Sequence, residues 1–300
     1  MATFKSWLNA ARLRTLPLSF SGIIVGSAMA LNDGEFNSTI FILALLTTLG
    51  FQVLSNFAND YGDGVKGTDN DERVGPKRAL QSGLLSEKEL KTGMLITIVF
   101  SLIVAIALIY VAFGFENMGY FWLFFLLGIA SIVAAVKYTV GKSAYGYKAM
   151  GDVFVFLFFG LLSVVGSYFL YTQTISLLIF LPAIAIGFLS SAVLNLNNMR
   201  DLITDKNVNK ITIPVLLGAK KAKKYHAFLL IGAYAAAFLY YYFSDVPWWH
   251  YLPLIAFIPL LDHYAKVKQN QTPSLLDPEL KKVALTTFLF AILFFVFNLF

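Results

Sequence analysis

Cysteine is absent from the 300-residue sequence, and charged residues are scarce. Without cysteine the chain can form no disulfide, no thiolate nucleophile and no cysteine-ligated metal site. Only 13% of the residues are charged and 58% are hydrophobic, whereas a soluble globular domain carries about 25% charged residues. The three histidines show no metal-ligand spacing, so we expect them to be structural or interfacial. This composition excludes a soluble protein and indicates a membrane protein.

Long apolar stretches recur along the chain. Each holds about 20 residues, enough to cross the roughly 30 Å of hydrocarbon in a bilayer, and only a helix satisfies the backbone polar groups of such a segment in lipid. We predict an all-α, polytopic transmembrane bundle of about nine helices that forms a single membrane-embedded domain over residues 1–300. The predicted spans are 15–31, 40–58, 93–113, 118–136, 152–171, 175–195, 225–243, 248–265 and 283–300.

The basic residues all fall on one side of these spans. The 23 Lys and Arg lie in the N-terminal segment and in the connections 59–92, 137–151, 196–224 and 266–282, while the short connections carry none. By the positive-inside rule, the N-terminus and the long connections are cytoplasmic, and an odd number of spans puts the C-terminus outside. We expect a multi-pass protein of the cell (inner or cytoplasmic) membrane. The net charge of +6 reflects this bias, so we expect no binding to nucleic acid.

A polar stretch, 56–78, directly follows the second predicted span. If the helix of that span continues, Asn59 and Asp63 lie on one face, four residues apart, with Asp60 beside them. A second polar stretch, 195–210, follows another span. There, positions 197, 201 and 205 recur every four residues and predict one stripe of one helix. These three positions hold Asn197, Asp201 and Asp205.

Carboxylates at the ends of membrane helices are costly without a partner, so a merely solvated acidic loop is a weak explanation. Two facing clusters would suit Mg²⁺, which prefers oxygen ligands. The ion is commonly bound by one or two carboxylates and a substrate phosphate together. A metal-bound diphosphate is a good leaving group, because the metal stabilises the charge that develops on it. Apolar helix walls would suit a long isoprenoid tail. The cations available for the outer phosphate oxygens are Lys66, Arg73, Lys77, Arg78, Lys142 and Arg200.

A cation-coupled transporter is an alternative from another class of protein. That function predicts carboxylates near the bilayer midplane, in broken helices. Here the acids stand at span ends, on one side, and cations follow them. The pattern therefore favours an enzyme that acts on a diphosphate.

The two motifs resemble those of the UbiA superfamily of intramembrane prenyltransferases, which have nine helices and motifs written NDxxDxxxD and DxxxD. Asn59, Asp60 and Asp63 match the first motif, and Asp201 and Asp205 match the second. The resemblance implies the superfamily fold, a polyprenyl diphosphate substrate and Mg²⁺ as cofactor.

One position departs from the superfamily pattern. Gly67 stands where the fourth position of the first motif is commonly Asp, and Asp69 follows two residues later. This form is similar to the 1,4-dihydroxy-2-naphthoate polyprenyltransferase (MenA-type) branch of menaquinone synthesis. Over about residues 7–220, four further stretches fit that branch: ARLRTLPLSFSGIIVG (11–26), GPKRALQSG (75–83), YTVGKSAYGYKAMGDVFVFLFFG (138–160) and NLNNMRDLITDKNVNKITIPVLLG (195–218).

The resemblance implies a reaction. A polyprenyl diphosphate loses diphosphate, and the electron-rich ring of 1,4-dihydroxy-2-naphthoate attacks the allylic cation. Loss of CO₂ and a proton then leads, after oxidation, to demethylmenaquinone. Arg78 matches the Arg of an RPLPSG-like stretch of the family, and with Lys77 it is assigned to the diphosphate. The implied metal ligands are Asp60, Asp63, Asp201 and Asp205, supported by Asn59 and Asn197, with Asp69 as a replacement for the missing carboxylate.

For one loop and two further residues, the sequence allows two interpretations. The 138–152 loop either contacts a substrate or is simply interfacial, and it favours dihydroxynaphthoate over other acceptors such as 4-hydroxybenzoate, homogentisate, haem or a sugar. Asp152 could orient or deprotonate the acceptor, or it could be a helix N-cap. Arg14 could bind a substrate carboxylate, or it could only contribute to the positive-inside charge bias. No obligatory protein partner is evident. The loop residues concerned are Tyr138, Lys142, Tyr145 and Tyr147.

Overall fold

The computed structural model describes residues 3–71 and 73–299, and the chain is helical over most of these ranges. One isolated bridge, between Lys148 and Ile211, is the only β pairing among the described residues. The predicted all-α fold is confirmed. The α-helices are α1 (Phe4–Ala11), α2 (Leu16–Asn32), α3 (Ser38–Val65), α4 (Glu87–Phe113), α5 (Met118–Lys137), α6 (Gly151–Val155), α7 (Ser167–Thr172), α8 (Phe180–Arg200), α9 (Leu202–Asn207), α10 (Ile213–Phe243), α11 (Pro259–Gln269) and α12 (Asp277–Phe297).

Eight helical segments within the described ranges are long and apolar enough to cross a membrane, and each overlaps a predicted span. One of them runs from α6 to α7 through a π-helical stretch, Phe156–Gly166. The predicted span 248–265 differs, because it begins as a 3-10 helix, Trp248–Phe257, before α11 continues it. Pro253 and Pro259 lie in this segment, and proline cannot donate the backbone bonds of a regular α-helix.

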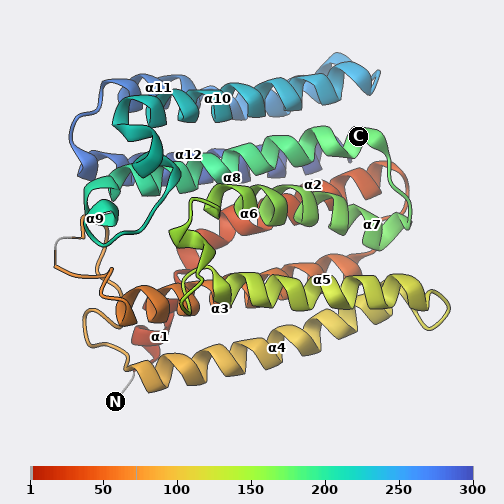
Figure 1. The fold of residues 1–300 in the computed structure, drawn as a ribbon. Coiled ribbons are helices and arrows are strands. Elements are labelled where there is room, and N and C mark those ends of the chain that lie inside the picture. The colour runs from red at the N-terminus through yellow and green to blue at the C-terminus, as the bar shows by residue number, and fades with distance from the viewer. Residues whose placement is uncertain (1–2, 72, 300) are drawn as a thin grey trace.

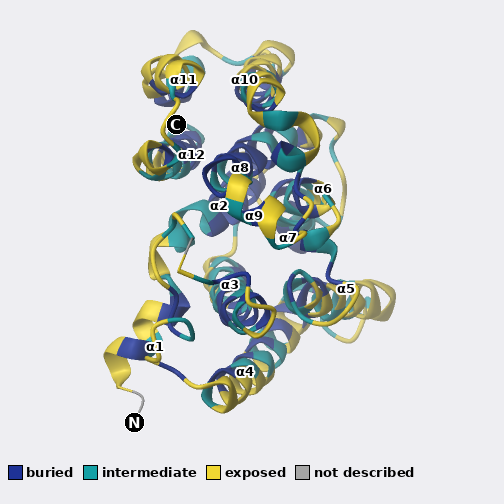
Figure 2. Ribbon diagram, turned by 60° about the vertical axis from the view of Figure 1, so that its left-hand side comes forward, coloured by how far each residue is buried: buried dark blue, intermediate teal, exposed yellow. Residues whose placement is uncertain are grey.

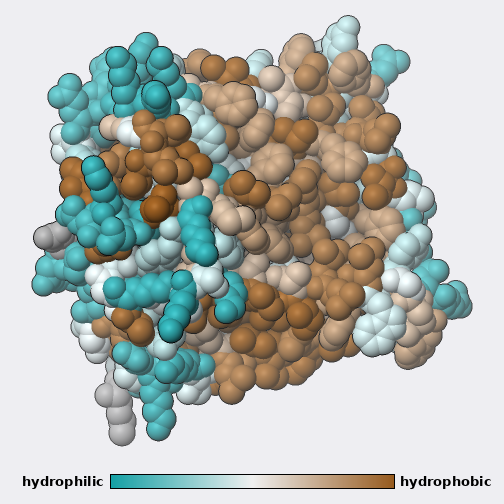
Figure 3. Space-filling model, viewed as in Figure 1, coloured by the Kyte–Doolittle hydropathy of each residue, from teal (hydrophilic) through white to brown (hydrophobic). Residues whose placement is uncertain are grey.

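The helices lie roughly side by side, and their connections gather at two ends of the molecule (Figure 1). α1 and α9 lie at one end, whereas the C-terminus is at the other. Figure 3 shows an apolar surface across the middle of the molecule and hydrophilic side chains concentrated at the end with α1 and α9. The arrangement follows the one-sided distribution of Lys and Arg in the sequence.

α8 occupies the interior of the bundle, where most of its residues are buried (Figure 2). It packs against α10, α12 and the π-helical stretch. Small residues permit a close approach of α8 to the π-helical stretch, since a Cβ on Gly160 would lie 2.6 Å from the Cα of Gly187. Close contact of this kind is a main source of helix association in lipid. This packing holds α8 in place, and the second acidic motif follows at the C-terminal end of α8.

Candidate active site

A cavity of about 1240 Å³ extends among the helices, and its lining includes Leu8 and Asn9 of α1. Figure 1 shows α1 at one end of the bundle. Helices α2, α3, α4, α5 and α8 and the α6–α7 segment contribute to its wall. Its polar end includes Asn59 and Asp63 from the first motif and Asn197 from the second. Its remaining wall is largely apolar. The structure therefore brings the two motifs to one end of one hydrophobic cavity.

The first motif lies on α3, which continues through Val65 as the spacing predicted. Asp63 is only 2% exposed, and its Oδ2 lies 2.8 Å from Nη1 of Arg78. Its other oxygen accepts a 2.7 Å hydrogen bond from the Tyr147 hydroxyl. Arg78 also donates to the backbone oxygen of Asn59 at 2.7 Å. A buried carboxylate is thus held at the cavity by one cation and one hydroxyl.

Asp69 joins the same network from the loop after α3. Its carboxylate lies 3.0 Å from Nε of Arg73 and 3.2 Å from Nε of Arg78. Burial raises the pKa of Asp69, and the nearby arginines oppose that rise. Burial alone would lower the pKa of Arg78, but Asp63 and Asp69 raise it above its ordinary value. Arg78 therefore stays a cation between two acids.

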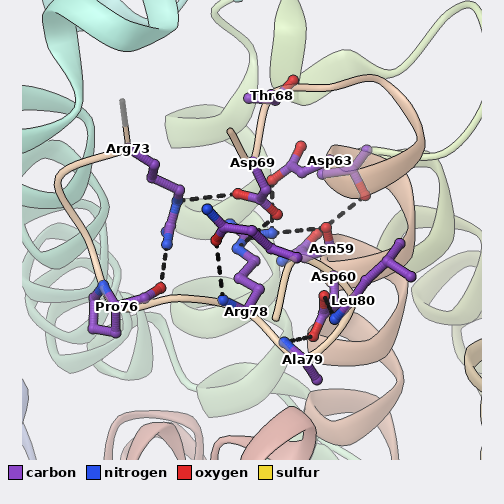
Figure 4. A network of polar contacts seen from close by, with 12 residues as sticks. Asn59, Asp60, Asp63, Thr68, Asp69, Arg73, Pro76, Arg78, Ala79 and Leu80 are labelled. Carbon is purple, nitrogen blue, oxygen red and sulfur yellow. Dashed lines mark hydrogen bonds and ion pairs between the residues drawn. The ribbon is translucent and has the colours of Figure 1, made fainter. Parts of the chain in front are cut away.

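Asp60 faces away from this network (Figure 4). Its two carboxylate oxygens accept hydrogen bonds from the backbone N–H groups of Ala79 and Leu80, at 3.0 and 3.1 Å. It is 1% exposed and does not line the cavity. Both oxygens therefore hold a turn that directly follows Arg78, and the metal-ligand role that the motif implies for Asp60 stays a prediction.

The second motif differs from the single helical stripe that its spacing predicted. α8 ends at Arg200, and Asp201, with φ −95° and ψ 13°, separates it from α9, which carries Asp205. Arg200 donates from Nε and Nη2 to both oxygens of Asp201, at 2.9 and 2.7 Å, and from Nη2 to Asn197 at 2.7 Å. Its Nη1 donates to Asp277 at the start of α12. Arg200, expected to bind substrate, has its guanidinium engaged by protein groups.

Asp205 is 3% exposed and pairs with Lys210, whose Nζ lies 3.4 Å away. Its Oδ2 is buried and accepts no hydrogen bond. Burial raises the pKa of Asp205 to about 6, against the opposing effect of Lys210. The bridge between Lys148 and Ile211 holds the two neighbouring loops together, and this places Tyr147 and Lys210 at the same end of the cavity.

The two motifs are connected by Arg73, whose Nη2 lies 4.0 Å from Oδ2 of Asp201 while its Nε contacts Asp69. In the described part of the chain, no three His, Asp or Glu residues are grouped closely enough to hold a metal by themselves. The donors present are nevertheless hard oxygens, and Asp205 keeps one of them buried without a partner. They fit Mg²⁺, which commonly keeps waters and takes few carboxylates directly.

The remaining predicted residues divide into two groups. Tyr138 and Tyr145 line the cavity, with ring centroids 5.3 Å apart, and so does Lys77, although its side chain is 71% exposed. Lys142 is exposed and is not part of the cavity wall. Asp152 lies behind the wall and accepts a 3.2 Å hydrogen bond from Tyr225 on α10. That contact favours a structural role for Asp152.

Arg12 is a cavity residue that the sequence interpretation missed. It lies between α1 and α2 with φ at +47°, lines the cavity, and has a buried Nη2 without a hydrogen-bond partner. A guanidinium nitrogen without a partner at the polar end is suited to an anionic group. Its proximity to the first span had suggested only a topological role, although the unusual pairing of two arginines before that span was a visible signal.

Comparisons with known proteins identify the family. The family model for the UbiA prenyltransferase family matches residues 19–275. A Haemophilus influenzae protein named 1,4-dihydroxy-2-naphthoate octaprenyltransferase is 44% identical over 292 residues, which cover 97% of this chain and 94% of that protein.

Two solved structures share the fold. An apo UbiA homologue from Aeropyrum pernix has a TM-score of 0.75 and 15% identity, over 95% of this chain and 98% of that one. A UbiA homologue from Archaeoglobus fulgidus bound to GPP and Mg²⁺ has a TM-score of 0.66 and 17% identity, over 98% and 100% of the two chains. With a family match over most of its length and a relative this similar, the chain belongs to the UbiA prenyltransferase family.

Proposed function

We propose that the protein transfers a polyprenyl chain from polyprenyl diphosphate to 1,4-dihydroxy-2-naphthoate, with release of diphosphate and CO₂. The product is the prenylated naphthoquinol, which oxidation converts to demethylmenaquinone. The observation that carries the proposal is the meeting of both acidic motifs and several cations at the polar end of one long apolar cavity. The acceptor is supported by the name of the Haemophilus relative and by the Gly67 form of the first motif.

Mg²⁺ is the proposed cofactor, supported by the homologue bound to GPP and Mg²⁺. Asp63 and Asp205 would hold it, with Asn59 and Asn197 beside them and Asp201 positioned by Arg200. When bound, it would neutralise charge that develops on the leaving diphosphate.

The chain supplies the rest of the diphosphate site. Arg78 and Lys77 lie at the polar end, and Arg12 presents an unpartnered nitrogen there. Fixed cations aimed at a leaving group stabilise its charge without reorganisation at the moment of reaction. We assign these three side chains to the diphosphate, and Asp60 to holding the turn that carries Arg78 in place.

The acceptor and the allylic carbon would lie against an aromatic wall. The rings of Tyr145 and Phe154 stack with centroids 3.9 Å apart, and Tyr138 packs edge-on to Tyr145. All three line the cavity next to its polar end. Aromatic faces stabilise a neighbouring cation by about 0.5–2 kcal/mol, depending on desolvation. They also exclude water, which would otherwise capture the allylic cation.

We also propose that the polar end of the cavity faces the cytoplasm and that the chain acts as one membrane-embedded domain of the cell membrane. The support is the restriction of all 23 Lys and Arg to the N-terminal segment and the long connections. The absence of an obligatory protein partner stays a prediction.

The test uses purified protein in detergent with MgCl₂ and octaprenyl diphosphate. Separate reactions contain dihydroxynaphthoate, 4-hydroxybenzoate or homogentisate, and each is followed for prenylated product, CO₂ and diphosphate. We expect product and CO₂ with dihydroxynaphthoate alone, loss of both with EDTA, and recovery when Mg²⁺ is restored. Product with another acceptor would move the activity to another branch of the family, and no diphosphate release with any acceptor would overturn the proposal.

A further inference from the structure

The deep part of the cavity is lined by both small and large side chains. On α5, the cavity-lining residues recur at helical spacing and are small midway along the helix, at Gly128 and Ser131. On the neighbouring helix α4, Ala105 lines the cavity one turn before Leu108 and Ile109. Gly128 and Ser131 therefore leave space in the middle of the cavity. Farther from the acidic motifs, larger side chains line it together with the small residues Gly166 and Ser167.

Four of these larger residues form what we call the cavity floor: Leu108, Ile109, Phe124 and Leu170. α4 and α5 are antiparallel neighbours joined by a short turn, so their floor residues lie at a similar depth. Along α3, the wall from Asp63 to Ala44 is about 28 Å long at the usual rise per residue. That depth suits a chain of several isoprene units lying along the helices.

The floor is supported from behind by packed aromatic rings. The ring of Phe124 lies 5.1 Å from that of the buried Phe113 and stacks on Phe169 at 5.7 Å. Rings in such contact stabilise one another by about 0.5–1.5 kcal/mol beyond their buried area. The end of the cavity is therefore a packed structure that resists displacement by one more isoprene unit.

We infer that this floor sets the longest prenyl tail the enzyme transfers, and that Gly128 keeps the passage to the floor open. The inference rests on the proposed function, because it takes the tail of the polyprenyl diphosphate as the occupant. The other route for the tail is sideways at the rim, where the lining residues Leu8, Leu13 and Leu285 are 40%, 43% and 46% exposed. A tail that left there would be insensitive to changes at Gly128.

The test is a competition between prenyl diphosphates of different length. Purified protein receives an equimolar mixture of geranyl, geranylgeranyl, octaprenyl and decaprenyl diphosphates with dihydroxynaphthoate and Mg²⁺, and mass spectrometry gives the product ratios. In Gly128→Leu, a side chain enters space that holds no atom within 4 Å of the added Cβ. We expect the octaprenyl-to-geranyl product ratio to fall at least about tenfold, because a few methylenes in an apolar pocket discriminate by that amount.

Gly119→Leu is the matched control. Gly119 lies on the same helix and also has no atom within 4 Å of an added Cβ, but it does not line the cavity. Its product ratios should stay within about twofold of wild type, as for other substitutions at exposed positions.

Phe124→Ala tests the floor from the opposite direction. Shortening this side chain deepens the cavity, so the decaprenyl-to-octaprenyl ratio should rise several-fold. Folding of each variant is checked by gel filtration and circular dichroism. Unchanged ratios in folded Gly128→Leu and Phe124→Ala would overturn the inference and assign the tail to the rim. Failure of the proposed function would look different, since the wild type would then make no product from any tail.

Discussion

The two acidic motifs share a sequence pattern but handle their acids differently. In the first motif, Asp60 is anchored by neutral backbone amides, while Asp63 faces the cavity. In the second, Asp201 is anchored by the charged fork of Arg200, while Asp205 keeps one buried oxygen without a partner. We call Asp60 and Asp201 the anchored acids. The other two are the available acids: Asp63 lines the cavity beside its partners Arg78 and Tyr147, and Asp205 keeps one oxygen free.

The anchors also differ in where they come from. The first motif is held by its own following loop, since Arg73, Arg78 and the amides of the 78–80 turn all lie within 20 residues of it. The second depends on a distant part of the chain, because Arg200 also contacts Asp277 at the start of α12. The first motif is therefore positioned by a neighbouring loop, and the second by an ion pair between residues far apart in the sequence.

The largest effect should come from Asp63, which lines the cavity, and from Asp205, which keeps a buried oxygen without a partner. Asp63→Asn keeps the shape of the side chain but removes its negative charge, so the purified variant should lose at least about a hundredfold in turnover. Dihydroxynaphthoate prenylation at saturating substrate measures this loss, and Asp205→Asn should behave in the same way. Glu87→Gln is the control, since that carboxylate is exposed at the start of α4 and does not line the cavity. Near-normal turnover in Asp63→Asn would remove the distinction between anchored and available acids.

An intermediate effect is expected from the charged anchor. Arg200→Lys keeps the positive charge but loses the two-pronged contact with Asp201 and the link to Asp277. The Mg²⁺ concentration for half-maximal rate should rise about 10- to 100-fold, as when other supporting partners of metal ligands are removed. The rate at saturating Mg²⁺ should recover substantially. Lys206→Ala, an exposed cation on α9, is the control, and an unchanged Mg²⁺ requirement in Arg200→Lys would assign Arg200 to the substrate instead.

The smallest effect on catalysis is expected from the neutral anchor. In Asp60→Asn, one acceptor oxygen becomes an NH₂ group, so a backbone N–H of the 79–80 turn loses its partner. The variant should lose about 1–3 kcal/mol of unfolding free energy, seen as a lower midpoint of thermal denaturation, with an unchanged Mg²⁺ requirement. A Mg²⁺ requirement that rises as strongly as in Arg200→Lys would instead support the ligand role that the motif implies for Asp60.

Hydropathy located the membrane-crossing parts of the helices but not their continuations beyond lipid. α4 begins at Glu87 and α10 at Ile213, well before the predicted spans 93–113 and 225–243. The start of α4 was predictable, because Ser86 and Glu89 form a capping box with the spacing S-x-x-E. The start of α10 was not, because a kink at Gly218, with φ at +74°, interrupts its pattern.

Within the site, residue spacing predicted the helical face of Asn59 and Asp63 but not the direction of Asp60, which depends on amides 19 and 20 residues later. The sequence also did not predict other contacts between residues far apart in the chain. His226 and His263 have no sequence relationship, yet their Nε2 atoms lie 2.7 Å apart, and Nδ1 of His263 lies 2.6 Å from Glu279. This buried chain joins α10, α11 and α12, and it fits the structural role expected for these histidines.

The cavity is polar at the end where the hydrophilic surface gathers and apolar at the end that lies deep among the helices. For the proposed reaction, its two substrates therefore come from different phases. A charged naphthoate arrives from three-dimensional solution, whereas a prenyl diphosphate arrives by lateral diffusion in a sheet. The rate then depends on a volume concentration for one substrate and on a mole fraction in lipid for the other. Dilution of the bilayer with inert lipid will lower the mole fraction of prenyl donor and so the rate, while the concentration of acceptor in solution stays the same.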